Sequence, residues 1–534
     1  MPNIITRRSF LSTAGRAAVG LGVASLMTIP PFLKRALAEG NIGINGKKLI
    51  FIFLRGGNDG VNNIIPILDP SYLGNRAIIG IPKHPTGDSY YTGTGGPGTC
   101  PGVDPLAPGV AIPLNNGFAA LNPALADMVP IYNAGDLALI HRVGYRSLSR
   151  SHFDSEQYWE KGADGSNYKS LADGIWYRTI VESGYNKNPL ALTGKPPSLT
   201  GVSLQSNMPA SLRGEQPMTN LSSMSRYNLL GIYSASGSTN LDRVKVLNAL
   251  DAANLQPFPA KDNRDLVHTL GVQFRDTLDI FQDPSFISNN FFDLNGTTKL
   301  FPTTSTEDPA GRFAGSFSFI QNMKSCAQIL NTTDAIITGS EIGGWDLHTG
   351  QVTPGTPSAG SHANLLKRVA GTYYSLWRYF SIYGKNGTNP SPGAQVGWND
   401  VVVVAMSEFG RTSAENDSMG SDHGEASVMY VAGGNVIGRV YGCDLLTTSG
   451  TVGPNWVMGS GKTGTLFSAN TSEGYVKRTI DYRSVLGEII RDHLGATPNQ
   501  LNRIIPAYAN EAAEHLFSGG TVSSTPILGE LGII

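Results

Sequence analysis

Short, uninterrupted apolar runs alternate along the chain with longer stretches of helical periodicity. The clearest apolar runs are 48–54 (KLIFIFL), 137–143 (LALIHRV), 335–338, 400–406 (DVVVVAM) and 428–431. Apolar residues at every position are typical of strands that are buried on both faces. Helices are predicted over 119–132, 151–162, 241–253, 262–281, 310–330, 363–383 and 481–494. Strands that alternate with helices predict an α/β fold with a mostly parallel central sheet and helices on both faces.

The first 38 residues carry the features of a twin-arginine export signal. Arg7 and Arg8 precede a moderately apolar run at 17–29, and residues 36–38 (ALA) match a small-x-small cleavage site. This apolar run is too short and too interrupted to span a bilayer, and no later run reaches 18 apolar residues. We therefore expect no transmembrane helix. We expect the twin-arginine translocase to export the chain to the periplasm or the medium.

The remaining sequence predicts one large domain over 39–510. Residues 85–115 are rich in Gly, Pro and Thr, which is typical of a surface loop. Residues 185–240 are rich in Ser, Asn and Pro, so we expect a helical and loop insertion at about 185–330. Residues 511–534 are expected to form a C-terminal tail.

Composition narrows the function further. The 534 residues include 40 Lys and Arg against 41 Asp and Glu, for a net charge of −1. This balance argues against a nucleic-acid binder, which needs an excess of positive charge. With only 3 Cys, the chain is not a disulfide-stabilised scaffold.

Polar clusters follow or precede the predicted strands. Ligands bind beyond the carboxyl ends of strands in an open parallel sheet, so these clusters are expected to converge there. The clusters contain Asp59, residues 149–152 (SRSH), Asp346 with His348, residues 407–411 (SEFGR) and residues 422–424 (DHG).

Carboxylates and imidazoles that meet at one edge have a definite chemical use. Together they bind divalent metals, and a bound metal polarises an ester oxygen and activates a nearby hydroxyl. Each residue also has an ordinary structural alternative. Asp59 between glycines is a turn former, Ser149 and Ser151 are typical helix caps, Arg411 is a structural ion-pair partner, and His152 is a core or supporting histidine.

Six segments carry a specific resemblance: 54–66 (LRGGNDGVNNIIP), 149–160 (SRSHFDSEQYWE), 343–351 (GGWDLHTGQ), 407–412 (SEFGRT), 420–434 (GSDHGEASVMYVAGG) and 481–495 (DYRSVLGEIIRDHLG). In them the chain resembles the twin-arginine-exported bacterial family called domain of unknown function 1501. That family resembles the alkaline phosphatase and sulfatase superfamily, whose members use two metals and a Ser, Thr or modified Cys nucleophile. The resemblance implies an alkaline-phosphatase-like fold.

The resemblance also implies roles for particular residues. Asp59 matches the Asp after the first strand, and Ser151 or Ser149 matches the hydroxyl nucleophile. Asp346 and His348 match the Asp-His pair, although they are two apart where the superfamily has four. His423 matches the last ligand.

A second departure concerns the segment after the valine-rich strand. The superfamily has Asp-His there, whereas this chain has Glu408-Phe409. In a second alignment, Asp422-His423-Gly424 is itself that motif, displaced by an insertion. We prefer the first alignment, because Glu408 directly follows the strand.

These observations lead to the hypothesis of an exported, metal-dependent hydrolase of phosphate or sulfate monoesters, acting on small molecules or polymers. The metal is Zn²⁺, Mg²⁺ or Ca²⁺, as one or two ions, and the candidate ligands are Asp59, Asp346, His348, Glu408, Asp422 and His423. In this hypothesis Asp346, His348 and His423 hold one ion, and Asp59 and Glu408 hold or bridge to a second. The candidate catalytic residues are Ser151 or Ser149 as nucleophile, Arg411 and Arg150 as charge-neutralising groups, and His152. The alternative is a non-catalytic binding or cell-surface protein on a degenerate hydrolase scaffold, which Phe409 in a ligand position favours.

Overall fold

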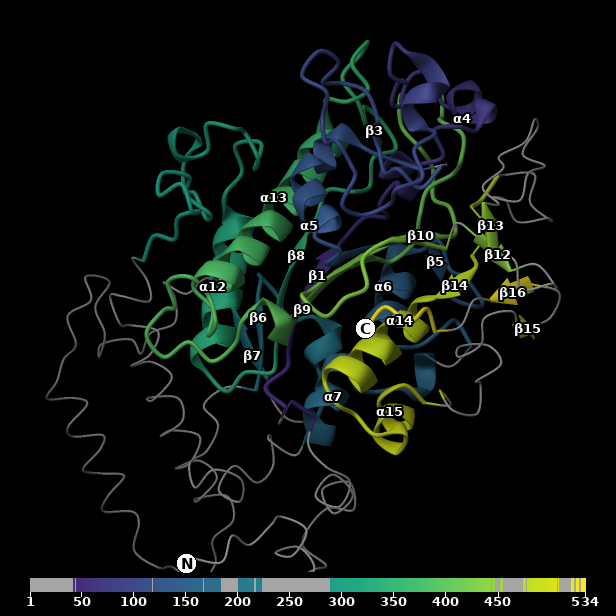
Figure 1. Ribbon diagram of the computed structural model, residues 1–534. Helices are drawn as coiled ribbons and strands as arrows, with labels where there is room; N and C mark the ends of the chain where they lie inside the picture. Colours follow the sequence, from purple (N-terminus) through teal and green to yellow (C-terminus); the bar gives the residue numbers. More distant parts are fainter. Residues whose placement is uncertain are drawn as a thin grey trace, which may run out of the picture.

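A large central sheet with helices on both faces organises the protein (Figure 1). The computed structural model describes residues 42–43, 45–183 except 118 and 167, 200–222 except 216 and 217, 289–446 except 443, 452–454, 474–508 except 477 and 507, 520–522, 525–527 and 530–534. The predicted export signal and the predicted helices at 241–253 and 262–281 lie outside the described residues.

The described strands of the sheet run in the order β11-β5-β10-β9-β1-β8-β6-β7, with β14 beside β5. Their bounds are β1 Lys48–Leu54, β5 Leu137–Gly144, β6 Gly201–Leu204, β7 Thr219–Leu221, β8 Ile337–Ile342, β9 Val401–Ser407, β10 Ser427–Ala432, β11 Val440–Tyr441 and β14 Ile480–Asp481. β1 pairs in parallel with both β8 and β9, whereas β10 runs antiparallel to β5 and β9. The predicted mostly parallel sheet is thus confirmed.

Strand β1 shows why the apolar runs are uninterrupted. Its alternate residues Ile50, Ile52 and Leu54 belong to one hydrophobic core, and Leu49, Phe51 and Phe53 belong to the other. Successive side chains of a strand point to opposite faces of the sheet. Residues 49–54 of this strand therefore place an apolar side chain in a core at every position.

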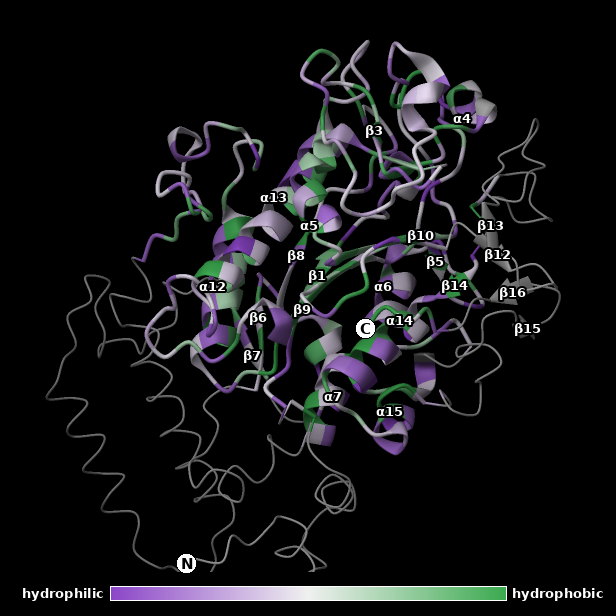
Figure 2. Cartoon of the chain, in the orientation of Figure 1, coloured by the Kyte–Doolittle hydropathy of each residue, from purple (hydrophilic) through white to green (hydrophobic). Residues whose placement is uncertain are grey.

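Helices supply the other half of each core. On one face lie α5 (Val129–Asn133), α12 (Ser318–Thr332) and α13 (Ser361–Ile382), and on the other lie α6 (His152–Lys161), α7 (Ile175–Ser183), α14 (Tyr482–Glu488) and α15 (Pro498–Ile504). In Figure 2 the helices around the sheet carry both apolar and polar residues, as expected of helices that pack one face on a core. Among the described residues, no helix has both the length and the apolarity needed to cross a membrane.

Smaller elements lie around this sandwich. A three-stranded sheet contains β2 (Ile64–Ile65), β4 (Ala120–Leu121) and β3 (Ile112–Pro113), near the short helix α4 (Pro70–Asn75). Two hairpins pair β12 (Asp444–Leu446) with β13 (Val452–Pro454) and β15 (Gly520–Val522) with β16 (Thr525–Ile527).

Two segments differ from the sequence-based expectation. The helix predicted over 119–132 is divided into β4, a 3-10 helix at Pro123–Met128 and α5. The reason is that Pro123 and Pro130 lack the amide donor that a helix interior requires, so a new helix starts near each. Within the range predicted as an insertion, β6 and β7 extend the main sheet beside β8.

The C-terminal residues 530–534 are held against the sheet domain by Glu488. The carboxylate of Glu488 accepts hydrogen bonds from the backbone amides of Leu531 and Ile533, and Ile533 is fully buried. Burial raises the pKa of Glu488 to about 7. The two amide hydrogen bonds lower this pKa, and the negative charge of the nearby Glu530 raises it, but burial is the largest effect.

This shifted pKa predicts a pH-dependent stability. Between about pH 4.5 and pH 7, Glu488 is protonated in the folded protein but ionised in the unfolded chain, where its pKa is 4.5. The free energy of unfolding should therefore fall as the pH rises from about 4.5 to about 7, by up to about 3 kcal/mol for this group. Denaturant unfolding of the wild type and of Glu488→Gln at pH 5 and pH 8 measures this contribution, and an equal pH dependence in both proteins would contradict it.

Candidate functional site

The strand directions bring the predicted clusters to one edge of the sheet. β9, β1 and β8 are parallel neighbours, so their carboxyl ends, followed by Glu408, Arg55 and Gly343, lie together. β10 runs the opposite way and therefore begins at the same edge, which places His423 there although it precedes a strand. An isolated antiparallel bridge joins Arg411 to His423.

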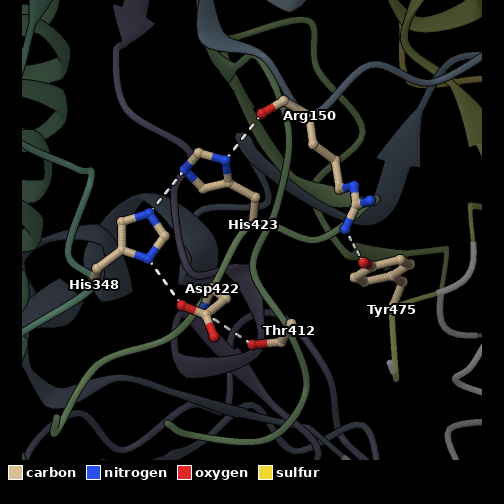
Figure 3. A pocket seen from close by; sticks show the side chains of 6 residues that line it. All are labelled: Arg150, His348, Thr412, Asp422, His423 and Tyr475. Atoms are coloured by element: carbon tan, nitrogen blue, oxygen red, sulfur yellow. Dashed lines mark hydrogen bonds and ion pairs between the residues drawn. The ribbon is translucent and has the colours of Figure 1, made fainter. Parts of the chain in front are cut away.

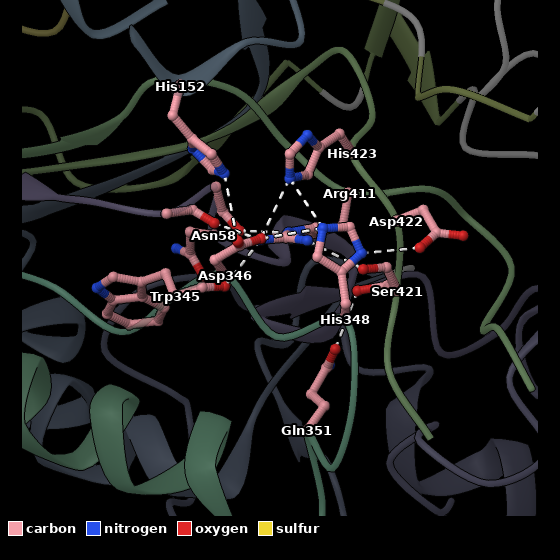
Figure 4. A network of polar contacts seen from close by, with 12 residues as sticks. Asn58, His152, Trp345, Asp346, His348, Gln351, Arg411, Ser421, Asp422 and His423 are labelled. Carbon is pink, nitrogen blue, oxygen red and sulfur yellow. Dashed lines mark hydrogen bonds and ion pairs between the residues drawn. The ribbon is translucent and has the colours of Figure 1, made fainter. Parts of the chain in front are cut away.

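Asp346 lies at the centre of a group of three histidines (Figure 4). Its Oδ1 lies 3.1 Å from Nε2 of His348 and 3.1 Å from Nε2 of His423, and its Oδ2 lies 3.5 Å from Nε2 of His152. The two Nε2 atoms of His348 and His423 are 3.0 Å apart. One ligand atom each from His152, Asp346 and His423 lies within 4.8 Å of the others.

The outer nitrogen of each imidazole is held by an oxygen acceptor. Nδ1 of His423 donates to the carbonyl of Arg150 at 2.9 Å, Nδ1 of His348 donates to Asp422 at 2.8 Å, and Nδ1 of His152 donates to Glu408 at 2.8 Å. Because these acceptors fix the proton on Nδ1, the neutral rings direct the lone pairs of their Nε2 atoms inward. This arrangement of an outer oxygen, an imidazole and an inner site is typical of metal-ligating histidines.

The donor set fits a divalent metal ion. Two inward nitrogen lone pairs 3.0 Å apart beside a carboxylate repel one another unless a cation or a proton lies between them. Ligand atoms at about 2.0–2.1 Å from a tetrahedral ion are about 3.3 Å apart, close to the 3.0–3.5 Å separations here. Of the predicted ligands, Asp346, His348 and His423 therefore meet at one point.

The buried side chain of Arg411 fixes the position of Asp346. The Arg411 side chain is 1% exposed and donates to Asp346 Oδ1 at 2.7 Å, and also to the carbonyls of Gly57, Gly56, Trp345 and Ser421. Burial opposes ionisation of Asp346, but the hydrogen bond and the positive charge of Arg411 help to outweigh it, and the pKa of Asp346 falls to about 2. The predicted role of Arg411 was to contact the transferred group. In the structure Arg411 instead donates to the carboxylate of Asp346, so that it acts as a positioning residue.

Glycine residues permit the loops to approach this closely. Gly56 has a φ of +122°, and a Cβ there would lie 2.4 Å from the backbone nitrogen of Asp346. Gly57 has a φ of +72°, and its Cβ would collide with the ring of Phe409. A side chain at Gly56 would push the loop after β1 away from the loop that carries Asp346, and a side chain at Gly57 would push it away from the segment that carries Phe409 and Arg411.

Glu408 and Asp422, both predicted as ligands, contact the outer nitrogens of histidines. Glu408 is fully buried, and its Oε1 accepts from His152 and from the backbone amide of Gly56 at 2.7 Å. The hydrogen bond to Glu408 raises the pKa of His152, whereas burial lowers the pKa of His423.

Asp59 lies in a separate buried ion pair. Its two oxygens accept from Arg76 at 2.6 and 2.9 Å, and Gln351 donates to it at 2.6 Å. Arg76 and Gln351 are both fully buried. The hydrogen bonds continue from Gln351 to Ser421, whose carbonyl accepts from Arg411. Sequence reasoning did not single out Arg76 or Gln351, although Gln351 closes the GGWDLHTGQ segment.

Ser149 and Ser151 belong to the segment whose residues Arg150 and His152 contact the histidine group. Ser151 stands between Arg150, whose carbonyl holds His423, and His152. Its side chain is exposed and does not cap α6. The hydroxyl of Ser149 accepts from the Ser151 amide at 3.2 Å and donates to Asp154 at 3.3 Å. Ser149 therefore shapes the turn, and Ser151 presents its hydroxyl outward.

An open pocket adjoins the group (Figure 3). It has a volume of about 600 Å³ and is lined by Arg150, His348, Thr412, Asp422, His423 and Tyr475. The Arg150 guanidinium lies 4.9 Å from the centre of the Tyr475 ring and donates to its hydroxyl. The pocket thus combines a fixed positive charge with two of the inward-facing imidazoles.

Substitution of Asp59 distinguishes a structural role, as the counter-charge of Arg76, from a role as a metal ligand. Asp59→Asn would leave Arg76 buried without a counter-charge, and breaking such a pair costs about 3–5 kcal/mol. We expect a large loss of stability in denaturant unfolding and an unchanged metal content of the folded fraction in elemental analysis. A folded Asp59→Asn protein that has lost its metal would instead assign Asp59 as a ligand.

Comparison with known proteins gives one match. A family model described as a protein of unknown function (DUF1501) matches residues 394–446, which include β9, Glu408, Arg411 and His423. No curated protein and no solved structure matches the chain. Part of the edge that carries the histidine group therefore resembles the DUF1501 family.

Proposed function

We propose that the protein is an exported, metal-dependent hydrolase of phosphate or sulfate monoesters, periplasmic or secreted, with an alkaline-phosphatase-like fold. Asp346, His348 and His423 form its metal centre, and Ser151 is its nucleophile. One observation carries the proposal: imidazoles whose outer nitrogens are held by protein oxygens aim their inner nitrogens at Asp346, beside an exposed serine.

The residues around the pocket have complementary tasks. Arg150 presents a guanidinium to the pocket, where it attracts an anionic ester. Ser151 attacks phosphorus or sulfur, the alcohol leaves, and water then releases phosphate or sulfate from the serine. A divalent ion held by Asp346, His348 and His423 would polarise the ester oxygen and favour the ionised form of the nucleophile. A pocket of about 600 Å³ has the size of a small-molecule site.

Chain geometry supports Ser151 over Ser149 in this role. The hydrogen bond from His423 to the Arg150 carbonyl fixes the backbone before Ser151, and the contact between His152 and Glu408 fixes it after Ser151. A nucleophile held on both sides loses little entropy when it reacts, which is the benefit of a fixed orientation.

Asp346→Ala removes the carboxylate on which the three histidines converge. We expect loss of bound metal and of turnover, measured by elemental analysis and by hydrolysis of an aryl phosphate and an aryl sulfate. Unchanged activity against both substrates would discard the scheme. Metal binding by the wild type without turnover of any ester would favour the alternative, a binding protein on a hydrolase scaffold.

The two serines provide a matched pair of variants. Ser151→Ala should lower kcat by at least about 10³-fold, because the attacking oxygen is lost, while metal content stays unchanged. Ser149→Ala removes two hydrogen bonds of the turn, to the Ser151 amide and to Asp154, and should lower kcat by less than about 10-fold. Steady-state kinetics of the two proteins test this order, and the reverse order would make Ser149 the nucleophile.

A further inference from the structure

We infer that His152 is a fourth ligand of the metal centre, and that the centre binds one divalent ion per chain and not two. The inference rests on the proposed metal dependence and concerns how many ions the chain holds and which residues hold them. It assigns His152, so far considered a catalytic residue, to the metal, and it assigns Glu408 to the orientation of His152.

The orientation of the His152 ring is the first observation that supports this inference. Its Nδ1 donates to the buried carboxylate of Glu408, so its Nε2 faces the centre, 3.5 Å from Asp346 Oδ2. That Nε2 is buried and, among the described residues, has no hydrogen-bond partner. A buried ring nitrogen with a bare lone pair needs a partner. An ion between His152, Asp346 and His423 would supply it, because one ligand atom from each of these residues lies within 4.8 Å of the others.

Packing holds the ring in this orientation. The ring centres of His152 and His423 are 4.5 Å apart, and Phe409 lies 4.8 Å from the first and 4.7 Å from the second. Phe409 is 1% exposed. It fills the space behind both rings and prevents them from turning away from Asp346.

The groups that a second ion needs are already engaged. Both oxygens of Asp59 are bonded to the guanidinium of Arg76, which neutralises the charge of that carboxylate. Glu408 accepts from His152, from the amide of Gly56 and from Ser407. Phe409, which offers no ligand atom, stands next to Glu408. Among the described residues of this region, the structure therefore provides one set of inward-facing ligand atoms, not two.

The donor set also restricts the type of ion. Three imidazole nitrogens and one carboxylate suit Zn²⁺, Mn²⁺ or Fe²⁺, whereas Ca²⁺ and Mg²⁺ prefer oxygen ligands. His152, Asp346 and His423 are the three residues whose ligand atoms all lie within 4.8 Å of one another, so an ion held by them has room for His348 or for substrate as a further ligand. Zn²⁺ and Mn²⁺ are both suitable probes.

Metal titration of the full-length protein tests this inference. The chain is stripped with a chelator and titrated with Zn²⁺ and with Mn²⁺, and bound metal is measured by elemental analysis. We expect one ion per chain, at least 100-fold weaker binding in His152→Ala, and 10- to 100-fold weaker binding in Glu408→Gln. The matched control is His84→Ala, which removes a histidine paired with Asp104 outside the group and should bind as the wild type does.

Two results would overturn the inference: two ions per chain, or wild-type affinity in a folded His152→Ala. If His152→Ala does not fold, His152→Asn takes its place, and the visible spectrum of bound Co²⁺ reports whether a nitrogen ligand has been lost. An unchanged Co²⁺ spectrum in that variant counts against the inference. Failure of the proposed function would give a different result. The protein would bind one ion tightly, and binding would depend on His152, but no ester would be hydrolysed.

Discussion

The buried guanidinium of Arg411 is the contact on which the site depends. It joins the loop after β1 through Gly56 and Gly57, the loop after β8 through Trp345 and Asp346, and the segment before β10 through Ser421. These three segments are distant in sequence and meet only because the sheet aligns their strands. A planar cation with several donors joins them in a fixed geometry that a lysine would not reproduce. The position of Asp346, and with it the whole histidine group, follows from this contact.

Around that anchor, the site is built in two layers of polar contacts. The inner layer contains the imidazoles and Asp346, and the outer layer contains Glu408, Asp422 and the Arg150 carbonyl. Each outer oxygen fixes the ring that it contacts. The hydrogen bond to Glu408 also raises the pKa of His152. The outer layer is therefore part of the chemistry and not only a support for it.

Hydrophobic patterning predicted the sheet well. The runs at 48–54, 137–143 and 400–406 became β1, β5 and β9 almost residue for residue, because strands that lie between two cores are mostly apolar on both faces. The helix expected at 119–132 failed because two prolines divide it, a signal that was present in the sequence. The short strands β6 and β7 carried too few residues for a pattern to show.

The candidate site was predicted in its members but not in its roles. Sequence placed Asp346, His348 and His423 at one edge, as the structure does. It gave no means of seeing that Arg76, 17 positions after Asp59, takes both oxygens of that carboxylate. Nor did it distinguish a carboxylate that faces a metal from one that holds the far side of a histidine, as Glu408 does. Both distinctions depend on side-chain direction, which no linear spacing records.

The reversed direction of β10 has a consequence for how such a site changes over time. The connection from β9 to β10 leaves the sheet and re-enters it at the same edge, so its length is not limited by the width of the sheet. Insertions or deletions in this hairpin move a donor such as His423 without disturbing either apolar layer. Coordinating groups can thus be exchanged among neighbouring loops while the strands stay in register, and related chains can keep one architecture with different spacings between their polar residues.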